Sequence, residues 1–140
     1  MKNATTSYPG IKRIGYLPTS KLSPQLMIKS IAGMPIAVLS DITFVSFYGE
    51  PICETSNFYK DGGRLEEVTL SFSTSVDIPT DVALAFVAET IAGKKFLIGT
   101  LEKPYPVVTI TRTTGSSSKS ATTSVEITHQ TQKSLLEVSF

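Results

Sequence analysis

Apolar and polar residues alternate along much of the chain, with the two-residue period of β-strands that bury one face. The segment "RLEEVTLSFSTS" shows this most clearly, because Val68, Leu70 and Phe72 would share one face of a strand. The positions between them are polar and would face solvent: Thr69, Ser71 and Ser73. This segment is therefore predicted to be a strand that covers a hydrophobic core.

Two hairpins follow from the same pattern. In "VALAFVAETIAGKKFLIGT" two alternating runs flank a turn around Gly93, and "YPVVTITRTT" and "TTSVEITHQT" flank the Ser-rich spacer "GSSSKSA". The spacer is expected to be a hairpin loop at 115–121. The alternation predicts these core residues: Val68, Leu70, Phe72, Leu84, Phe86, Phe96, Ile98, Val108, Ile110, Val125 and Ile127.

Glycines and prolines mark the turns between further strands. The Asp61-Gly62-Gly63 run supplies positive-φ positions for a tight turn, and Ser40-Asp41 is expected to bend the β-rich segment 35–51. Pro104 and Pro106 lack backbone donors, so "KPYP" is predicted to cross between sheets, anchored by Tyr105. The closing "SLLEVSF" is predicted to be a paired strand in which Leu136, Val138 and Phe140 share a face.

A single segment, "SPQLMIKSIAG", has helix signals. Ser23 could cap a helix, Pro24 suits its first position, and Gly33 could end it. Its apolar residues do not form a clean helical stripe, so a strand is the alternative here.

The resulting fold class is all-β: an antiparallel β-sandwich or barrel of about seven to nine strands, with at most one short helix near residues 23–33. At 140 residues the chain is expected to form a single β domain over 11–140. Residues 1–10 are polar, end in Pro9-Gly10, and are expected to form a mobile N-terminal arm.

The composition argues against several classes of function. Thirteen basic and twelve acidic side chains give a formal net charge of +1, without the basic excess of nucleic-acid-binding proteins. The start of the chain does not resemble a secretory signal, and no apolar run is long enough to span a bilayer. With Cys53 as the only cysteine, no intrachain disulfide can form.

Candidate catalytic or metal-binding groups are few. One histidine, His129, and one cysteine cannot build a conventional zinc site, and they could act as nucleophile and base only if the fold joined them. His129 is predicted to be a hydrogen-bonded structural residue at the edge of the core, and Cys53 a buried, inert thiol. We therefore expect no catalytic residue, no metal and no cofactor.

The acidic residues lead to the same expectation. Glu66 and Glu67 are adjacent, so on a strand they would face opposite ways. Asp77 and Asp81 could offer loop oxygens to calcium, but turn and cap chemistry accounts for both, and no regular calcium loop is present.

Aromatic residues leave open a binding surface. The chain has no tryptophan, but the side chains that could form a sugar-binding platform are these: Tyr8, Tyr16, Tyr48, Phe58, Tyr59 and Tyr105. A surface carbohydrate- or protein-binding β-sandwich module is therefore the alternative hypothesis for function.

Three stretches carry a resemblance: "IKRIGYLPTSKL…LMIKSIAGMPIAVLSDIT", "KKFLIGTLEKPYPVVTITRTTG" and "SVEITHQTQKSLLEVSF". The order of these segments resembles small structural proteins encoded by phages and prophages of Bacteroides-type bacteria. The resemblance implies a non-enzymatic virion structural or assembly protein, expected in the tail or neck and assembled in the host cytoplasm. It transfers no functional residues.

A protein of that kind would pair with itself in a homo-oligomeric ring and with other virion proteins. We expect no membrane, no primary nucleic-acid partner and no small-molecule ligand. Polar segments at the arm and the Ser-rich loop are the expected contact elements, and the candidate interface residues are Tyr8, Pro9, Gly115, Ser116, Ser117, Ser118 and Lys119.

Overall fold

The computed structural model describes residues 4–8, 10–33, 41–113 and 122–138. Within these ranges the chain forms two five-stranded antiparallel sheets. Sheet A contains, in spatial order, β1 (Ala4–Tyr8), β4 (Tyr48–Lys60), β5 (Gly63–Thr74), β9 (Thr122–Thr131) and β8 (Val107–Thr113). Sheet B contains β10 (Leu136–Glu137), β7 (Lys95–Ile98), β6 (Leu84–Thr90), β2 (Ile11–Pro18) and β3 (Thr43–Val45).

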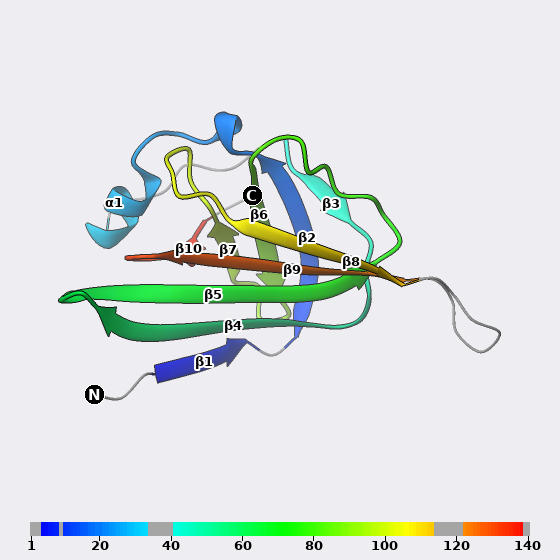
Figure 1. Cartoon of the computed structure of the whole chain (residues 1–140), viewed down its shortest axis with the longest axis horizontal. Coiled ribbons are helices and arrows are strands. Elements are labelled where there is room, and N and C mark those ends of the chain that lie inside the picture. The colour runs from blue at the N-terminus through cyan, green and yellow to red at the C-terminus, as the bar shows by residue number, and fades with distance from the viewer. Residues whose placement is uncertain (1–3, 9, 34–40, 114–121, 139–140) are drawn as a thin grey trace.

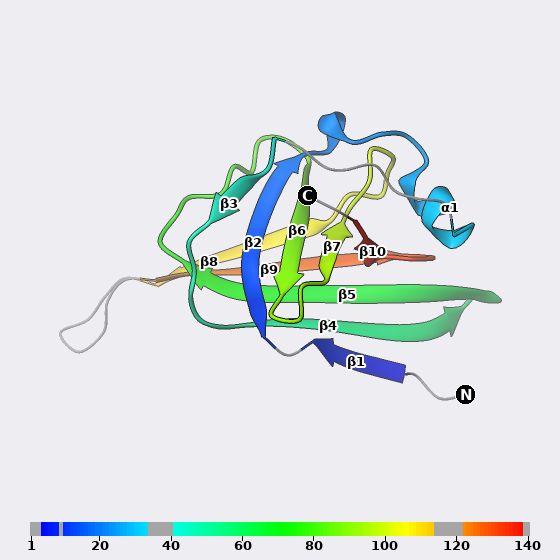
Figure 2. The ribbon, with the colours of Figure 1, turned by 180° about the vertical axis from the view of Figure 1, so that it is seen from behind.

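The predicted all-β class is confirmed, and the arrangement is a sandwich. Strands make up 57% of the structure, and the sheets do not close into a barrel. The strands of sheet B cross behind those of sheet A (Figure 1), and the view from behind shows β2, β6 and β7 in front (Figure 2). Antiparallel strands that are joined by short hairpins favour such packing of two sheets face to face.

The space between the sheets holds the main core. All the core residues predicted from the alternation lie there, with Val108 and Ile110 partly buried at its margin and the rest buried. Sheet B adds Ile11, Ile14 and Val45, and each side chain of this size contributes about 1.5–3 kcal/mol when fully buried.

Sheet B is buried on its other face as well, so every residue of β6 is buried. A second cluster forms there under η1 (Thr19–Lys21), α1 (Leu26–Ile31) and the end of the chain. Its buried members are Leu17, Leu22, Leu26, Ala85, Val87, Leu97 and Leu136. Sheet A, in contrast, keeps one face of its strands open to solvent, and we call this the outer face.

The helix is shorter than its sequence signals suggested. Neither Ser23 nor Pro24 starts it, because the N-cap is Gln25, which has φ 61°. The Gln25 backbone N–H donates to Glu102 Oε1 at 2.5 Å, so a tertiary contact fixes this end. Gly33, with φ 75°, follows the C-cap Ala32 as predicted.

The predicted turns at Asp61-Gly62 and around Gly93 are confirmed, whereas Ser40 of the predicted Ser40-Asp41 bend lies outside the described residues. Asp61 and Gly62 have φ of 52° and 79° and join Lys60 to its partner Gly63, the two-residue turn that suits the twist of a hairpin. In the second hairpin, the Gly93 and Thr90 amides donate to Thr90 O and Lys94 O, respectively.

Two other sequence features lie where predicted. The segment with Pro104 and Pro106 connects β7 of sheet B to β8 of sheet A, and Tyr105 is half-buried. The Lys103–Pro104 peptide is cis. At the closing strand, Leu136 and Val138 join the second cluster, whereas Phe140 lies outside the described residues.

The N-terminal segment differs from the expected arm. Ala4–Tyr8 forms strand β1, which pairs along β4 from Ala4 opposite Asn57 to Tyr8 opposite Cys53. Its backbone therefore belongs to sheet A. Alternation did not identify this strand because "ATTSY" lacks a run of apolar residues. Across the described ranges, no helix combines the length and apolarity needed to cross a bilayer.

Candidate functional site

The thiol and the imidazole do not form a catalytic pair. Cys53 lies on β4 opposite Leu70, and His129 lies on β9 opposite Val68. Strand β5 runs between β4 and β9, so two strand spacings, roughly 10 Å, separate them. A hydrogen bond between their side chains would need less than half that distance.

Burial also makes both groups poorly suited to proton transfer near neutral pH. Burial, with a smaller contribution from the Glu54 charge, raises the pKa of the Cys53 thiol to about 11. Burial lowers the pKa of His129 to about 4. The predicted locations are confirmed, since both residues are buried and His129 shares the inward face of Val125 and Ile127.

The carboxylates are separated, as predicted. Glu66 Oε1 accepts the backbone N–H groups of Ser134 and Leu135, each at 2.9 Å, whereas Glu67 accepts from Gln130 on the outer face at 3.3 Å. Asp77 forms an exposed ion pair with Arg112 at 3.1 Å. Across the described residues, no group of three or more His, Cys, Asp or Glu side chains is arranged to hold a metal ion.

Most of the candidate interface residues lie outside the described ranges: Pro9, Gly115, Ser116, Ser117, Ser118 and Lys119. Tyr8 is described through its backbone, as the last residue of β1. Strands β8 and β9 extend to Thr113 and Thr122, so the predicted hairpin connects through the Ser-rich segment.

Strand β8 forms an edge of sheet A. It pairs with β9 from Val107 opposite Thr128 to Thr113 opposite Thr122, and no other described strand lies on its far side. Within the described residues, its backbone makes no hydrogen bond to the neighbouring loop that carries Asp77. Val107, at the start of this edge, is 63% exposed. An edge of this kind offers backbone donors and acceptors to another chain.

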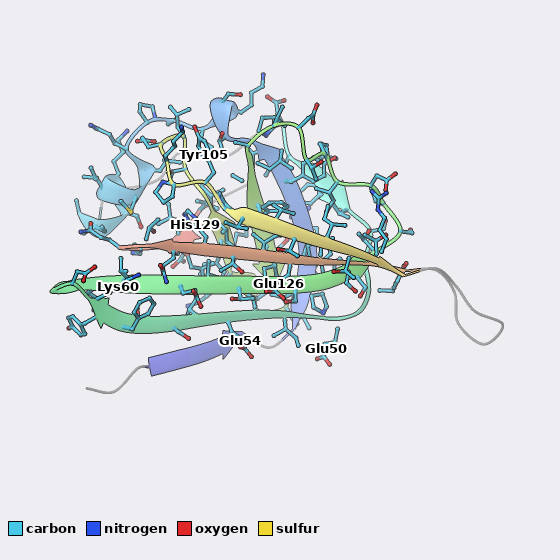
Figure 3. The ribbon with its side chains drawn as sticks, in the orientation of Figure 1. Glu50, Glu54, Lys60, Tyr105, Glu126 and His129 are labelled. Carbon is cyan, nitrogen blue, oxygen red and sulfur yellow. The ribbon has the colours of Figure 1, made fainter. Side chains whose placement is uncertain are left out.

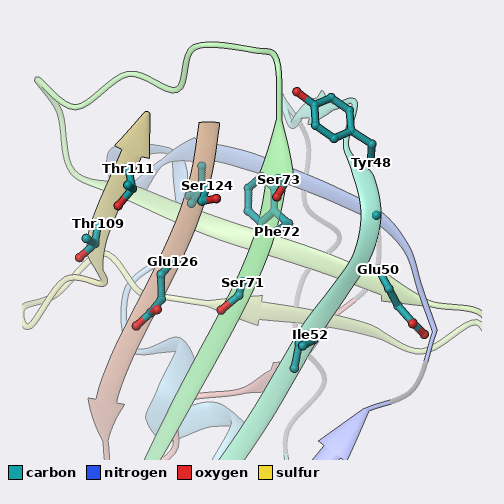
Figure 4. Close-up of a pocket in the computed structure, with 12 residues that line it drawn as sticks. Tyr48, Glu50, Ile52, Ser71, Phe72, Ser73, Thr109, Thr111, Ser124 and Glu126 are labelled. Carbon is teal, nitrogen blue, oxygen red and sulfur yellow. The ribbon is translucent and has the colours of Figure 1, made fainter. Parts of the chain in front are cut away.

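The outer face of sheet A carries a groove of about 260 Å³ near the β8–β9 hairpin. Two cross-strand rows line it, each with one residue from β4, β5, β9 and β8. One row is Tyr48, Ser73, Ser124 and Thr111. The other row is Ile52, Ser71, Glu126 and Thr109. Figure 4 shows both rows facing the same side of the sheet.

A bulge in β4 separates Tyr48 from Ile52. Between these residues β4 has Gly49, Glu50 and Pro51, while β5 has only Phe72 between Ser71 and Ser73. Gly49 has φ 75°, in the left-handed region that favours glycine. Extra residues of this kind bend a strand and redirect its side chains, which places Tyr48 at the rim of the groove.

The groove is acidic and rich in hydroxyl groups. Its lining includes the Glu50 and Glu126 carboxylates, and no Lys or Arg belongs to the described part of the lining. Tyr48 is 43% exposed and Ile52 51% exposed, which gives the groove an aromatic and an aliphatic contact surface. Figure 3 shows Glu50, Glu54 and Glu126 along the same sheet.

Among the candidate aromatic residues whose side chains the structure describes, none other than Tyr48 lines the groove, Phe58 included, and the side chain of Tyr8 lies outside the described part. Tyr16 packs against the main core, Tyr105 lies in the crossing between the sheets, and exposed Tyr59 is at the far end of β4. Sequence reasoning identified Tyr48 as a candidate but missed the groove. The signal was the glycine within "FYGEPIC", since a glycine inside a strand pattern indicates a bulge.

Comparison of the chain with protein-family models, with curated proteins and with solved structures finds no match.

Proposed function

We propose that this protein is a non-enzymatic structural subunit of a phage or prophage virion that forms a homo-oligomeric ring in the tail or neck. The observation that carries the proposal is the free edge of β8, which lies at the border of a five-stranded sheet. The sequence resemblance described above supplies the virion context. Burial of the Cys53 thiol and the His129 imidazole supports the non-enzymatic part.

The strand directions restrict how copies could join through sheet A. Each neighbouring pair in this sheet is antiparallel, so β1 and β8, at its two edges, run in the same direction. A head-to-tail contact between β8 and β1 of the next copy would therefore be parallel. Contacts of this heterologous type generate a closed ring when the rotation between copies closes and an open filament when it does not, whereas a two-fold β8–β8 contact stops at a dimer. The proposed ring uses the head-to-tail arrangement.

Two variants test the proposed contact from its two sides. Val107→Lys adds a charge to the β8 edge, and deletion of residues 1–8 removes β1. Ile91→Lys is the matched control, because Ile91 is a 74% exposed apolar residue in the β6–β7 turn, outside sheet A. Charged residues on edge strands oppose pairing, and the deletion removes the strand with which β8 would pair, so each edge variant should weaken assembly at least about tenfold.

Light scattering coupled to size-exclusion chromatography measures the outcome. The unmodified chain and Ile91→Lys should form a closed oligomer of the same size, and the two edge variants should shift to monomer. Loss of assembly in Val107→Lys alone would indicate the two-fold dimer. A monomeric unmodified chain at high concentration would refute the proposal.

A further inference from the structure

We propose that the groove on the outer face of sheet A binds an uncharged oligosaccharide. The two rows across the groove carry five hydroxyl side chains, one tyrosine, one isoleucine and the Glu126 carboxylate. This inference goes beyond the proposed function and does not depend on it. A virion subunit and a monomeric module could both use such a site.

The chemistry of the lining matches the chemistry of a sugar. A saccharide presents many hydroxyl groups, each of which donates and accepts, together with weakly polar C–H faces. Serine and threonine hydroxyls can serve in both roles, while ionised carboxylates accept strongly from sugar hydroxyls. Tyr48 and Ile52 supply the apolar contact for a ring face.

These polar groups are available for a ligand. Within the described residues, the groove's Ser71, Ser73 and Ser124 hydroxyls and the Glu126 carboxylate have no hydrogen bond to another protein group. Water therefore forms the hydrogen bonds of these groups in the free protein. The hydroxyl groups of a polyhydroxylated ligand can take the place of the individual water molecules.

Charge selects among saccharides. Glu50 and Glu126 line the groove, and Glu54 lies one row further along the same face, opposite Thr69. Like-charge repulsion from these carboxylates disfavours acidic polysaccharides. The same argument disfavours nucleic acids, whose phosphates require Lys or Arg contacts.

The shape of the groove suits a chain rather than a single sugar. Its rows cross four neighbouring strands, and the three spacings between them, at about 4.8 Å each, give a width of roughly 14 Å. The groove is open, and the bulge at Gly49–Pro51 places Tyr48 at one end (Figure 4). An extended oligosaccharide can therefore lie across the strands with one ring against Tyr48.

Isothermal titration calorimetry of the full chain with defined probes tests the inference. The neutral probes are the hexaoses of β-1,4-glucose, β-1,3-glucose, β-1,4-mannose and β-1,4-N-acetylglucosamine, and the acidic probes are oligogalacturonate and heparin fragments. We expect binding of at least one neutral hexaose and none of the acidic probes. Failure of every neutral probe, or tighter binding of an acidic one, would overturn the inference.

Matched variants locate the binding. Tyr48→Ala removes the aromatic surface and should weaken the affinity for the neutral hexaose about tenfold. Glu126→Gln keeps the shape of the side chain but removes its charge, and it should weaken the affinity by a similar factor. As controls, Tyr59→Ala removes a tyrosine that is more exposed than Tyr48 (57% against 43%), and Glu54→Gln removes a carboxylate of the same face; both lie outside the groove. The affinity of each control variant for the hexaose should stay within about twofold of that of the unmodified chain.

The variant results separate this inference from the proposed function. Equal affinity in Tyr48→Ala, Glu126→Gln and both controls would show that any sugar binds elsewhere. Light scattering of Tyr48→Ala should give the same oligomer as the unmodified chain, because the groove faces outward from the sheet rather than along its edge. If the chain is monomeric but binds a neutral hexaose, the proposed ring is refuted and the inference that the groove binds saccharide stands.

Discussion

Tyr48 lies directly opposite Ser73 in the ladder between β4 and β5, yet the next pair on this face is Ile52 with Ser71. The intervening bulge therefore decides which side chains meet on the outer face of sheet A. Without it, the regular two-residue period would place Glu50, not Ile52, opposite Ser71. The groove is thus a consequence of the bulge as well as of composition.

Gly49→Ala tests the backbone conformation on which this bulge depends. Gly49 has φ 75°, and an alanine there would be strained although a Cβ would meet no atom within 4 Å. We expect the free energy of unfolding to fall by about 1 kcal/mol, because the left-handed cost of about 1–2 kcal/mol exceeds the gain from a less flexible unfolded chain. Urea denaturation measures this change.

Gly63→Ala is the control for Gly49→Ala. Gly63 is also in sheet A, but its φ lies outside the left-handed region and a Cβ would be 3.7 Å from Lys60 O, an ordinary contact. Its stability should be unchanged or slightly higher. Equal losses of the free energy of unfolding in the two variants would mean that the left-handed conformation of Gly49 is not the cause of the destabilisation.

The alternation of residues predicted the sheets well, because side chains that face a shared core must recur at every second position. Val68, Leu70 and Phe72 illustrate this, and the turn at Asp61-Gly62 could be recognised from its residues alone. The pairing of β1 with β4 could not be predicted from the sequence, because "ATTSY" has few apolar residues and the backbone hydrogen bonds of a strand pair leave no pattern in the sequence.

The candidate sites show the same limit. Sequence reasoning could predict the position of His129, because it follows Val125 and Ile127 onto the buried face of its strand, and it predicted Cys53, in the strand segment "PICET", to be a buried thiol. The groove could not be predicted from the sequence, because the eight residues of its two rows come from four strands and meet only through the register of those strands. A short helix presents a similar case: the start of α1 depends on the distant Glu102 rather than on Ser23.

Cys53 should react slowly with thiol reagents in the folded protein. It is 1% exposed, and its pKa is raised to about 11, so little thiolate is present at pH 8. We expect Ellman's reagent to modify the native thiol more than about a hundredfold more slowly than the denatured chain. Cys53→Ala supplies the blank, and rapid native labelling would place the thiol at the surface.

The Arg13–Glu89 ion pair should be visible in the titration of Glu89. Arg13 Nη2 lies 2.7 Å from Glu89 Oε1, and the hydrogen bond from Arg13 holds the pKa of Glu89 below its usual value. Because the folded-state pKa is lowered, this contribution to stability is present above the unfolded pKa and is lost as pH falls through the folded one.

Arg13→Met tests that assignment while keeping a long side chain over Phe44, whose ring centroid lies 4.5 Å from the guanidinium carbon. Carbon-detected NMR of the glutamate carboxyls should give a higher pKa for Glu89 in Arg13→Met than in the unmodified chain. An unchanged Glu89 titration would show that the pair does not persist in solution.

His129 should make the protein less stable in mild acid. Its pKa is lowered from 6.5 to about 4 by burial, so the unfolded chain binds a proton at a pH where the folded chain does not. Its stabilising effect is therefore complete above about pH 6.5 and declines as pH falls toward 4. Between pH 7 and pH 5 the free energy of unfolding should drop by about 2 kcal/mol from this residue.

His129→Gln separates this effect from the other titrating groups, because glutamine fills a similar volume and carries no charge. Urea denaturation over pH 5–7 should give a steeper decline in the unmodified chain than in the variant. This range avoids most of the effect of Glu89, whose usual pKa is 4.5 and is lowered further in the folded protein. Parallel declines in the two proteins, or an NMR midpoint for His129 near 6.5, would mean that the imidazole is protonated as easily in the folded sandwich as in the unfolded chain.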